Sequence, residues 1–320
     1  MVGGGLVSFL SNKRVVITGS SGFLGSNLIE VMKGNNLDKD VDLFLPRSRD
    51  YDLRKLDAAI STTRGADVVI NLAANVGGIG YNRNNPGRLF YDNIMIGVNM
   101  IEAARINDVG KLVLIGTVCS YPKYTKTPFK EEDLWNGYPE ETNAPYGIAK
   151  KSLIVMSDAY KKQYGLNSIN LLIVNLYGSR DNFDLESSHV IPAMIRKYID
   201  AKRSNSKTVK LWGTGNASRE FLYVKDAASG IILATEKYDK TSPVNLGSGQ
   251  EIKIKDLAKI ISDLVGFEGE TEWDSSMPDG QPSRRLDTSV ALKEFGFRAT
   301  TPLKNGLKDV IVWYNENYRG

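Results

Sequence analysis

Residues 14–32, RVVITGSSGFLGSNLIEVM, join three local patterns that together indicate one kind of fold. The first is a short apolar run rich in β-branched side chains, which is typical of a buried strand. The spacing GxxGxxG follows, and apolar residues then recur at helical intervals. Glycines let the backbone approach a pyrophosphate, whose charge is favoured at a helix N-terminus. The stretch therefore predicts a dinucleotide-binding turn made of Gly19, Ser21, Gly22, Phe23, Leu24 and Gly25.

The segments that follow continue the alternation of buried strand and amphipathic helix. Strands are predicted at 41–45, 67–73, 111–116 and 169–176, and helices at about 88–107 and 145–164. Apolar strands that alternate with helices indicate a parallel sheet covered on both faces. We therefore expect an α/β fold with a Rossmann-type, doubly wound parallel sheet.

Beyond residue 178 the pattern becomes less regular and predicts a smaller, mixed α/β lobe. Helices are expected near 190–202, 255–265 and 303–317, and short strands near 207–212 and 243–246. No low-complexity linker separates the two parts, so we expect them to pack tightly. The expected organisation is a disordered extension at 1–12, a dinucleotide-binding domain at 13–178 and a substrate-binding lobe mainly at 179–320, some of whose strands are free to return to the main sheet.

Composition and charge exclude several classes of protein. Of the 320 residues, 42% are hydrophobic and 24% are charged, and the formal net charge is +4. No uninterrupted apolar run reaches about 18 residues, and acids are interspersed with bases, so neither a membrane nor a nucleic acid is an expected partner. A single cysteine cannot form an intramolecular disulfide, which fits a reducing compartment, and we expect the cytoplasm. No metal site is predicted.

The second predicted strand is followed by Arg47 and Arg49, where NAD-preferring sites usually offer an acid to the ribose 2′-hydroxyl. An arginine can pair with a 2′-phosphate, so this position favours NADPH. NADH, and a purely solvent-facing role for the arginines, stay open. Asp52 follows closely enough to reach the adenine. Ala73 and Ala74 end the third strand, where the ribose of the cofactor would pass.

A tyrosine and a lysine in the sequence YGIAK, Tyr146 and Lys150, share one face of a predicted helix. A nearby ammonium stabilises a phenolate, which lets a tyrosine exchange a proton with a substrate oxygen, and the same lysine can hold the nicotinamide ribose. Thr117 ends the preceding strand and supplies a hydroxyl. Together with the glycine turn, this set predicts a carbonyl reductase site, and an ordinary exposed tyrosine–lysine pair is the alternative.

Longer motifs make the chain resemble the extended short-chain dehydrogenase/reductases, and among these the GDP-L-fucose synthases. The likeness runs from about residue 13 to the C-terminus and includes AANVGGIGYN at 73–82, GTVCSYPK at 116–123, NAPYGIAK at 143–150, NLYGSRDNF at 175–183, SHVIPAMIR at 188–196, WGTGNASREFLYVKD at 212–226 and MPDGQPSRRLD at 277–287. The resemblance gives Thr117, Tyr146 and Lys150 the reductase roles. It makes Cys119 the base and His189 the acid of an epimerisation. These two are the only cysteine and the only histidine of the chain.

The resemblance implies that a GDP-4-keto-6-deoxyhexose is inverted at C3 and C5 and then reduced at C4, giving GDP-L-fucose. A C4 ketone acidifies the hydrogens on C3 and C5, so inversion needs one group that removes a proton and another that returns one to the opposite ring face. A thiolate and an imidazole have suitable pKa ranges. Without the resemblance, Cys119 would be interpreted as a small buried hydrophobe and His189 as a polar loop residue.

Further contacts are implied at the sugar-nucleotide end of the site. Arg219 resembles the phosphate-binding arginine of the family, because a guanidinium binds a diphosphate in a bidentate way, and a surface salt bridge is its alternative. Asn175 is expected to border the cofactor and the sugar. The remaining expected substrate contacts are Val190, Lys197, Trp212, Asp279 and Arg285. Trp212 is equally compatible with a place in the core.

Departures from the family pattern leave alternatives open. Thr117 replaces a serine, the serines at 20–21 stand where a basic residue is common, and Lys197 replaces an arginine. A related GDP-sugar such as a 6-deoxyheptose, or C4 reduction alone, therefore stays open. A sugar 4,6-dehydratase is rejected because no acidic pair follows Thr117. A nucleotide-sugar 4-epimerase with retained NAD would have no use for Cys119 and His189, and a non-catalytic dinucleotide-binding protein would not need the reductase set.

Two predicted helices, 88–107 and 145–164, carry apolar residues beyond one narrow stripe, among them Ile94, Val98, Ile101, Leu153 and Met156. Members of the resembled family pair through these helices, so the resemblance implies a homodimer. The alternative is that these side chains only pack on the sheet of their own chain.

Overall fold

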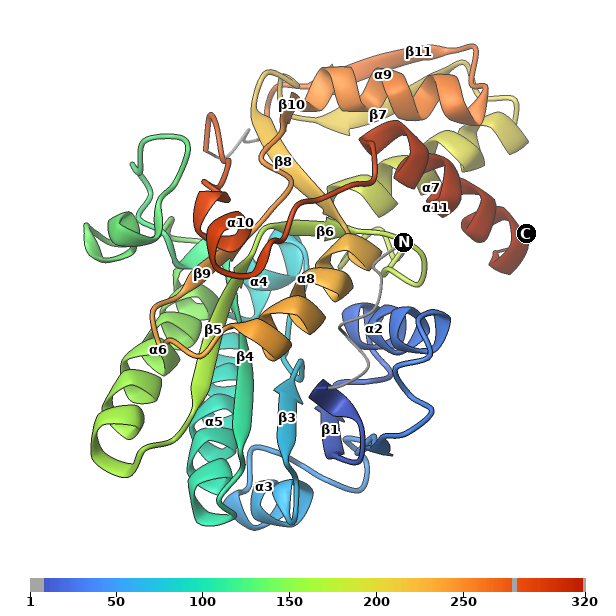
Figure 1. Cartoon of the computed structure of the whole chain (residues 1–320). Coiled ribbons are helices and arrows are strands. Elements are labelled where there is room, and N and C mark those ends of the chain that lie inside the picture. The colour runs from blue at the N-terminus through green and yellow to red at the C-terminus, as the bar shows by residue number, and fades with distance from the viewer. Residues whose placement is uncertain (1–8, 278–280, 319–320) are drawn as a thin grey trace.

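The computed structural model describes residues 9–277 and 281–318, and its centre is a six-stranded sheet with the order β2-β1-β3-β4-β5-β9 (Figure 1). The strands are β1 (Arg14–Thr18), β2 (Asp42–Phe44), β3 (Val68–Asn71), β4 (Lys111–Thr117), β5 (Ser168–Ile173) and β9 (Val244–Leu246). All neighbouring strands in it are parallel. The chain runs outward from β1 to β2 on one side and from β3 to β9 on the other. This is the doubly wound arrangement expected from the sequence.

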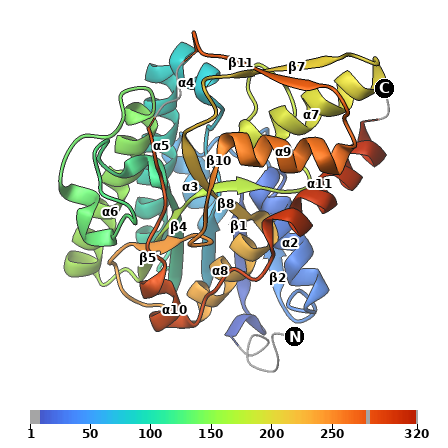
Figure 2. The same cartoon turned by 90° about the horizontal axis from the view of Figure 1, so that it is seen from above.

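Helices cover both faces of this sheet. One layer consists of α2 (Phe23–Gly34) and α8 (Val224–Lys237), and the other of α3 (Leu56–Thr63), α5 (Pro86–Ile106) and α6 (Ala144–Tyr164). Successive side chains of a strand point to opposite faces. Val15 and Ile17 accordingly pack with the α2–α8 layer, whereas Val16 packs with the α3–α5–α6 layer. Figure 2 shows the sheet between the two layers. Because both faces are buried, the central strands are mainly apolar.

The second lobe has a core of its own beyond the carboxyl end of the sheet (Figure 1). Its elements are α7 (Val190–Arg203), β7 (Thr208–Trp212), α9 (Ile254–Val265), β11 (Glu270–Asp274) and α11 (Leu303–Asn317). β7 and β11 pair in parallel, and buried aromatic side chains such as Tyr198 and Tyr314 fill the core. A three-stranded sheet of β10 (Glu251–Lys253), β8 (Ser218–Tyr223) and β6 (Asn175–Tyr177) lies between this lobe and the main sheet.

Four short helices complete the described part of the chain. They are α4 (Ile79–Asn84), η1 (Val118–Ser120), η2 (Glu131–Trp135) and α10 (Ser289–Phe295). None of the helices in the described ranges is both long and apolar enough to cross a membrane.

The structure differs from the expected boundaries in three places. The strand expected at 169–176 is divided into β5 and β6, which belong to different sheets, and the N–H of Val174 between them donates to the carbonyl of Leu246 in β9. Helix α8 follows residue 178 yet belongs to the layer that covers the main sheet, and β9 returns to that sheet as the expected organisation allowed. Leu10 is 3% exposed and packs in the core, so residues 9–12 are part of the folded domain. Residues 1–8 of the expected extension lie outside the described residues.

Candidate active site

One large cavity lies where the carboxyl ends of the parallel strands meet the second lobe. Its volume of about 1150 Å³ exceeds the roughly 300–1,000 Å³ of pockets that take one small ligand. The ends of β1, β3, β4 and β5 line one side, and α7, β7 and β8 line the other. This is the switch point at which doubly wound sheets bind ligands. The volume suits a dinucleotide together with a second ligand.

The glycine turn has the backbone geometry that a pyrophosphate site needs. Gly19 has a φ of +66°, in the left-handed region that favours glycine. A Cβ on Gly25 would lie 2.3 Å from the carbonyl oxygen of Gly19, so only glycine fits there. Helix α2 begins at Phe23 with no side-chain cap, which leaves the N–H groups of its first turn for a ligand. The cavity wall includes all the expected turn residues and both alanines after β3: Gly19, Ser21, Gly22, Phe23, Leu24, Gly25, Ala73 and Ala74.

The two arginines after β2 are placed differently. Arg49 lines the cavity and its side chain is 83% exposed, whereas Arg47 lies outside the cavity wall. Arg47 begins a turn in which its carbonyl accepts the N–H of Tyr51, and the later residues of this turn face the cavity. Of the residues expected to contact the cofactor after β2, Arg49 and Asp52 line the cavity and Arg47 does not.

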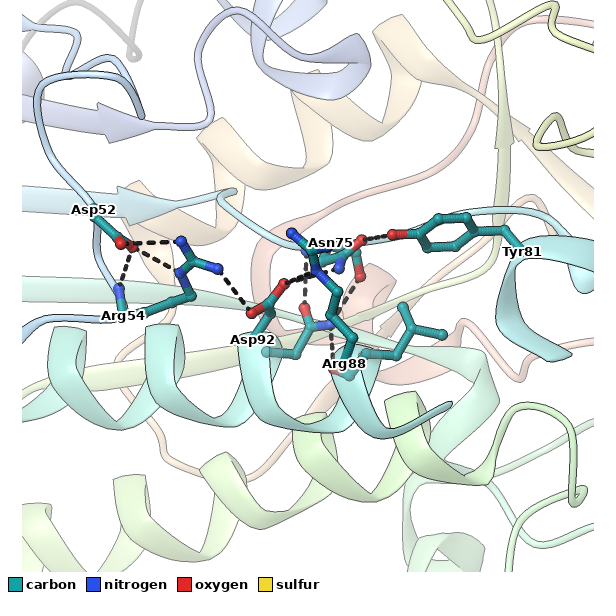
Figure 3. A network of polar contacts seen from close by, with 8 residues as sticks. Asp52, Arg54, Asn75, Tyr81, Arg88 and Asp92 are labelled. Carbon is teal, nitrogen blue, oxygen red and sulfur yellow. Dashed lines mark hydrogen bonds and ion pairs between the residues drawn. The ribbon is translucent and has the colours of Figure 1, made fainter. Parts of the chain in front are cut away.

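A chain of ion pairs crosses the cofactor end of the cavity (Figure 3). Arg54 donates to Asp52 through Nε at 2.8 Å and Nη2 at 3.0 Å, and to Asp92 of α5 through Nη1 at 3.2 Å. Asn75 also donates to Asp92, at 3.0 Å. The hydrogen bond from Arg54 lowers the pKa of Asp52. Burial opposes the charge of Asp92, but the bonds from Asn75 and Arg54 outweigh it and lower its pKa. Arg54, which the sequence did not single out, thus ties the loop after β2 to α5.

Thr117, Tyr146 and Lys150 all line this cavity. Thr117 ends β4, and its Oγ1 accepts the N–H of Cys119 at 3.1 Å. Tyr146 and Lys150 project from α6, with the lysine Nζ 6.0 Å from the centre of the tyrosine ring. Burial lowers the pKa of Lys150 to about 8. Burial also raises the pKa of Tyr146, and the nearby Cys119 adds to this effect.

Helix α6 is packed directly on the turn that carries Cys119. A Cβ on Gly147 would lie 2.3 Å from the carbonyl oxygen of Cys119. The hydroxyl of Ser120 donates to the carbonyl of Gly147 at 2.9 Å. The glycine therefore allows the close approach that brings Tyr146 beside Cys119.

Cys119 and His189 line the same cavity from opposite lobes. Cys119 is partly buried in η1, after β4. His189 precedes the first residue of α7 and has an exposed side chain. Desolvation by the surrounding protein lowers the pKa of its imidazole. The side chain nevertheless remains exposed and lines the cavity. The loop before it is held by Ser187, whose carbonyl accepts the N–H of Gly78 at 2.8 Å.

Arg284 reaches the site where Arg285 was expected. Arg284 is 8% exposed and lines the cavity, with its Nη1 3.7 Å from the sulfur of Cys119, whereas Arg285 does not line it. Neighbouring residues of an extended segment point to opposite sides, so a shift of one position decides which arginine enters. The tandem arginines were the signal that could have raised this possibility. Asp279 lies outside the described residues.

The remaining expected contacts, Asn175, Val190, Lys197, Trp212 and Arg219, all line the cavity. Arg219 Nη1 donates to the carbonyls of Ser218 at 2.7 Å and Gln281 at 2.6 Å. Trp212 is 53% exposed, so it is not a core residue. Two cations and an exposed indole suit an anionic ligand with an aromatic base. Within the described residues, no group of three or more His, Cys, Asp or Glu side chains is placed to hold a metal ion.

The fold and the cavity define an α/β enzyme of the Rossmann type that uses a nicotinamide dinucleotide. Residues 15–247 match the model of the NAD dependent epimerase/dehydratase family. The chain belongs to this family.

Individual relatives are similar over nearly the whole chain. The GDP-L-fucose synthase of Sinorhizobium fredii is 39% identical over 300 residues, which cover 93% of this chain and 94% of the relative. The GDP-L-fucose synthase of Escherichia coli is 38% identical over 321 residues, which cover 96% of this chain and 98% of the relative. A GDP-D-glycero-L-gluco-heptose synthase from Campylobacter jejuni, solved in the presence of NADPH, matches with a TM-score of 0.86 and 29% identity over 97% of this chain and 100% of that chain. The likeness expected from the motifs is confirmed.

Proposed function

We propose that this protein inverts C3 and C5 of a GDP-4-keto-6-deoxyhexose and then reduces C4 with NADPH, giving GDP-L-fucose. The observation that carries the proposal is that Thr117, Tyr146 and Lys150 line one cavity together with Cys119 and His189. A reductase set and an acid–base pair can therefore act on one bound sugar. Support also comes from the GDP-L-fucose synthases of S. fredii and E. coli, which are 39% and 38% identical to this chain.

The cofactor of the proposed reaction is NADPH, which supplies a hydride to C4 when bound. The glycine turn at 19–25 would hold its pyrophosphate, and Arg49 would pair with its 2′-phosphate. Asp52, Ala73 and Ala74 would border the adenosine half, and Lys150 and Asn175 the nicotinamide half. We assign the cofactor half of the site to residues 13–178 and the substrate half mainly to 179–320.

Replacing Arg49 tests the coenzyme assignment. Arg49→Gln removes a charge-assisted bond worth about 1.5–3 kcal/mol, so we expect the KM for NADPH to rise by about 10-fold or more while the KM for NADH changes little. Arg47→Gln is the matched control, because Arg47 does not line the cavity, and it should alter neither value. Equal changes for both coenzymes on Arg49→Gln would contradict the assignment.

In the epimerisation, Cys119 as a thiolate removes the proton from a carbon beside the ketone, and His189 returns a proton to the opposite ring face. Their positions in opposite lobes suit a ring that lies between them. After each inversion Cys119 holds a proton and His189 lacks one, so both must exchange with solvent before the second inversion. We place the reaction in the cytoplasm, where the single cysteine stays a free thiol.

In the reduction, Tyr146 donates its phenolic proton to the C4 oxygen as the hydride arrives. The Lys150 ammonium stabilises the phenolate that remains. The hydroxyl oxygen of Thr117 already accepts the N–H of Cys119, so its own O–H is left to donate to the substrate oxygen. Each group of the reductase set thus has a separate task.

A second candidate is the same chemistry, or C4 reduction alone, on a related GDP-heptose. It is favoured by the TM-score of 0.86 with the C. jejuni heptose synthase. Lys197, which replaces an arginine of the family pattern, donates to the carbonyl of Lys210 at 3.0 Å. A lysine held in this way offers less to a diphosphate than a free guanidinium would.

Incubation with GDP-4-keto-6-deoxymannose in heavy water separates these candidates. Deuterium at C3 and C5 is followed by NMR, and oxidation of NADPH by its absorbance. Incorporation at both carbons with oxidation of NADPH is the result expected for the bifunctional enzyme. Oxidation without incorporation would mean C4 reduction alone. The absence of both signals would overturn the proposal for this sugar. The same assay would then be applied to GDP-heptoses, or the protein tested as a 4-epimerase with retained NAD.

We further propose a homodimer that pairs through α5 and α6. Ile101 and Leu153 are buried within their own chain, so they cannot carry the contact as expected. Partly exposed Ile94 and Val98 and exposed Val155 offer an apolar surface instead. Val155→Glu should shift the mass measured by light scattering toward one chain, because it places a charge in the interface.

Val312→Glu is the control for this dimer prediction. Val312 lies on α11, away from α5 and α6, and its exposure of 55% matches the 56% of Val155. This variant should keep the dimer mass. A wild-type mass of one chain would overturn the dimer.

A further inference from the structure

A buried arginine without a carboxylate partner lies beside the proposed base. The Arg284 side chain is 8% exposed. Within the described part of the chain, its guanidinium hydrogen-bonds to the side-chain oxygen of Gln281 and to the sulfur of Cys119, and it forms no ion pair. Burying a charge without an opposite charge is unfavourable. A cation kept in this position therefore needs an explanation in the chemistry of the site.

The guanidinium is held in one orientation. The Oε1 atom of Gln281 accepts one hydrogen bond from Nε of Arg284 at 2.9 Å and a second from its Nη2. Gln281 is itself buried, and its amide donates to the carbonyl of Lys123. This anchoring leaves Nη1 of Arg284 at 3.7 Å from the sulfur of Cys119. Gln281 is neutral, so it holds the guanidinium of Arg284 beside the sulfur without cancelling its positive charge.

We propose that Arg284 is a positioning residue for Cys119, whose thiolate it stabilises as a fixed counter-ion. The inference rests on the proposed epimerisation, in which Cys119 removes the proton. A cation beside a thiol favours its ionised, nucleophilic form. Other titratable side chains that line this cavity include Glu140 before α6, Tyr146 and Lys150 on α6, and His189 before α7. In the described structure only Arg284 hydrogen-bonds to the sulfur.

Alkylation of the single cysteine tests the proposal without any substrate. The full chain, free of ligand, is treated with iodoacetamide at pH 7, and the modified fraction is followed by mass spectrometry. Loss of a neighbouring charge changes a thiol's ionisation by about 10- to 1,000-fold, and the higher nucleophilicity of a more basic thiolate offsets about half of this on a logarithmic scale. We expect Arg284→Gln to slow alkylation by about 3- to 30-fold.

Two variants separate the charge from the shape of the residue. Arg284→Lys keeps the charge and should restore most of the wild-type rate. Arg285→Gln removes the neighbouring arginine, which does not line the cavity, and should leave the rate unchanged. At pH 10, where the thiol ionises with or without a counter-ion, the Arg284→Gln protein should react at least as fast as the wild type. A deficit that persists at pH 10 would indicate blocked access and overturn the proposal.

The proposal is also wrong if folded Arg284→Gln protein is alkylated at the wild-type rate at pH 7, and Arg284 then only anchors the 281–287 segment. If this variant does not fold, Gln281→Leu serves instead, because it frees the guanidinium while keeping the charge. Slower alkylation would support the proposal, and an unchanged rate would overturn it. Since alkylation needs no sugar, a failure of the epimerase assay leaves this result interpretable.

Discussion

Lys150→Met and Tyr146→Phe should each slow the oxidation of NADPH by about 1,000-fold, while deuterium exchange at C3 and C5 continues. Positioned proton transfer contributes about 10²- to 10⁴-fold to a rate, and neither side chain takes part in the proposed proton transfers at C3 and C5. Lys150 is buried beside the cavity, so an ammonium ion from bulk solvent cannot replace it. The two signals are recorded in one reaction by absorbance and NMR.

The pH profile gives this prediction a second readout. Burial lowers the pKa of Lys150 to about 8. Its ammonium form is therefore complete well below pH 8 and is lost as the pH rises through that value, so the rate of reduction should fall on the alkaline side with a midpoint near 8. Lys150→Met should lack this fall. Lys161→Met, at the exposed far end of α6, is the control and should behave as the wild type. Loss of both deuterium exchange and reduction in Lys150→Met would contradict the proposal that reduction and epimerisation use separate side chains.

Cys119→Ser should show the opposite pattern, with deuterium exchange lowered by about 10²- to 10⁴-fold and NADPH oxidation retained. A serine hydroxyl keeps the approximate size of the thiol but is a far weaker acid, so it is not ionised near neutral pH. The ketone at C4 does not depend on Cys119, and Tyr146 and Lys150 remain in place. NMR of the product should therefore show a sugar reduced at C4 with its original configuration at C3 and C5.

His189→Asn is the companion variant. It removes the only imidazole of the chain, so no second histidine can return the proton. Inversion at one or both carbons should fall as far as in Cys119→Ser, whereas the solvent-exchanged Cys119 thiol still returns deuterium to the original face. Full inversion in either variant would remove that residue from the proposed pair, and loss of NADPH oxidation in both would indicate disturbed substrate binding.

The main sheet and the glycine turn could be predicted from the sequence because their signals are local. Buried strands are continuous apolar runs, and GxxGxxG follows the first of them. Helix α8 was missed, and part of its packing depends on small residues that contact distant parts of the chain. A Cβ on Gly230, for example, would lie 2.9 Å from the ring of Phe297, a residue distant in sequence. Such contacts are tertiary and have no local signature.

Most of the expected site residues in the described ranges line the cavity, and the exceptions, Arg47 and Arg285, each stand within two positions of an arginine that does. Arg284 lines the cavity and Arg285 does not, and Arg49 lines it while Arg47 does not. In extended or turning backbone, direction changes from one residue to the next, so composition identifies an arginine-rich segment without telling which arginine enters. Arg54 was missed for another reason. Its partner Asp92 lies on a different element, and no sequence pattern joins the two.

The pairing of β5 with β9 limits how the enzyme can open. β9 comes from the half of the chain that carries the substrate lobe, but its backbone is hydrogen-bonded into the main sheet. A rigid-body rotation of all residues after 178 about a hinge would have to break this ladder. Access for a nucleotide sugar must therefore come from smaller segments, such as the loop at 181–188 that precedes His189. Motion of this loop, rather than separation of two domains, would then set the rate of product release.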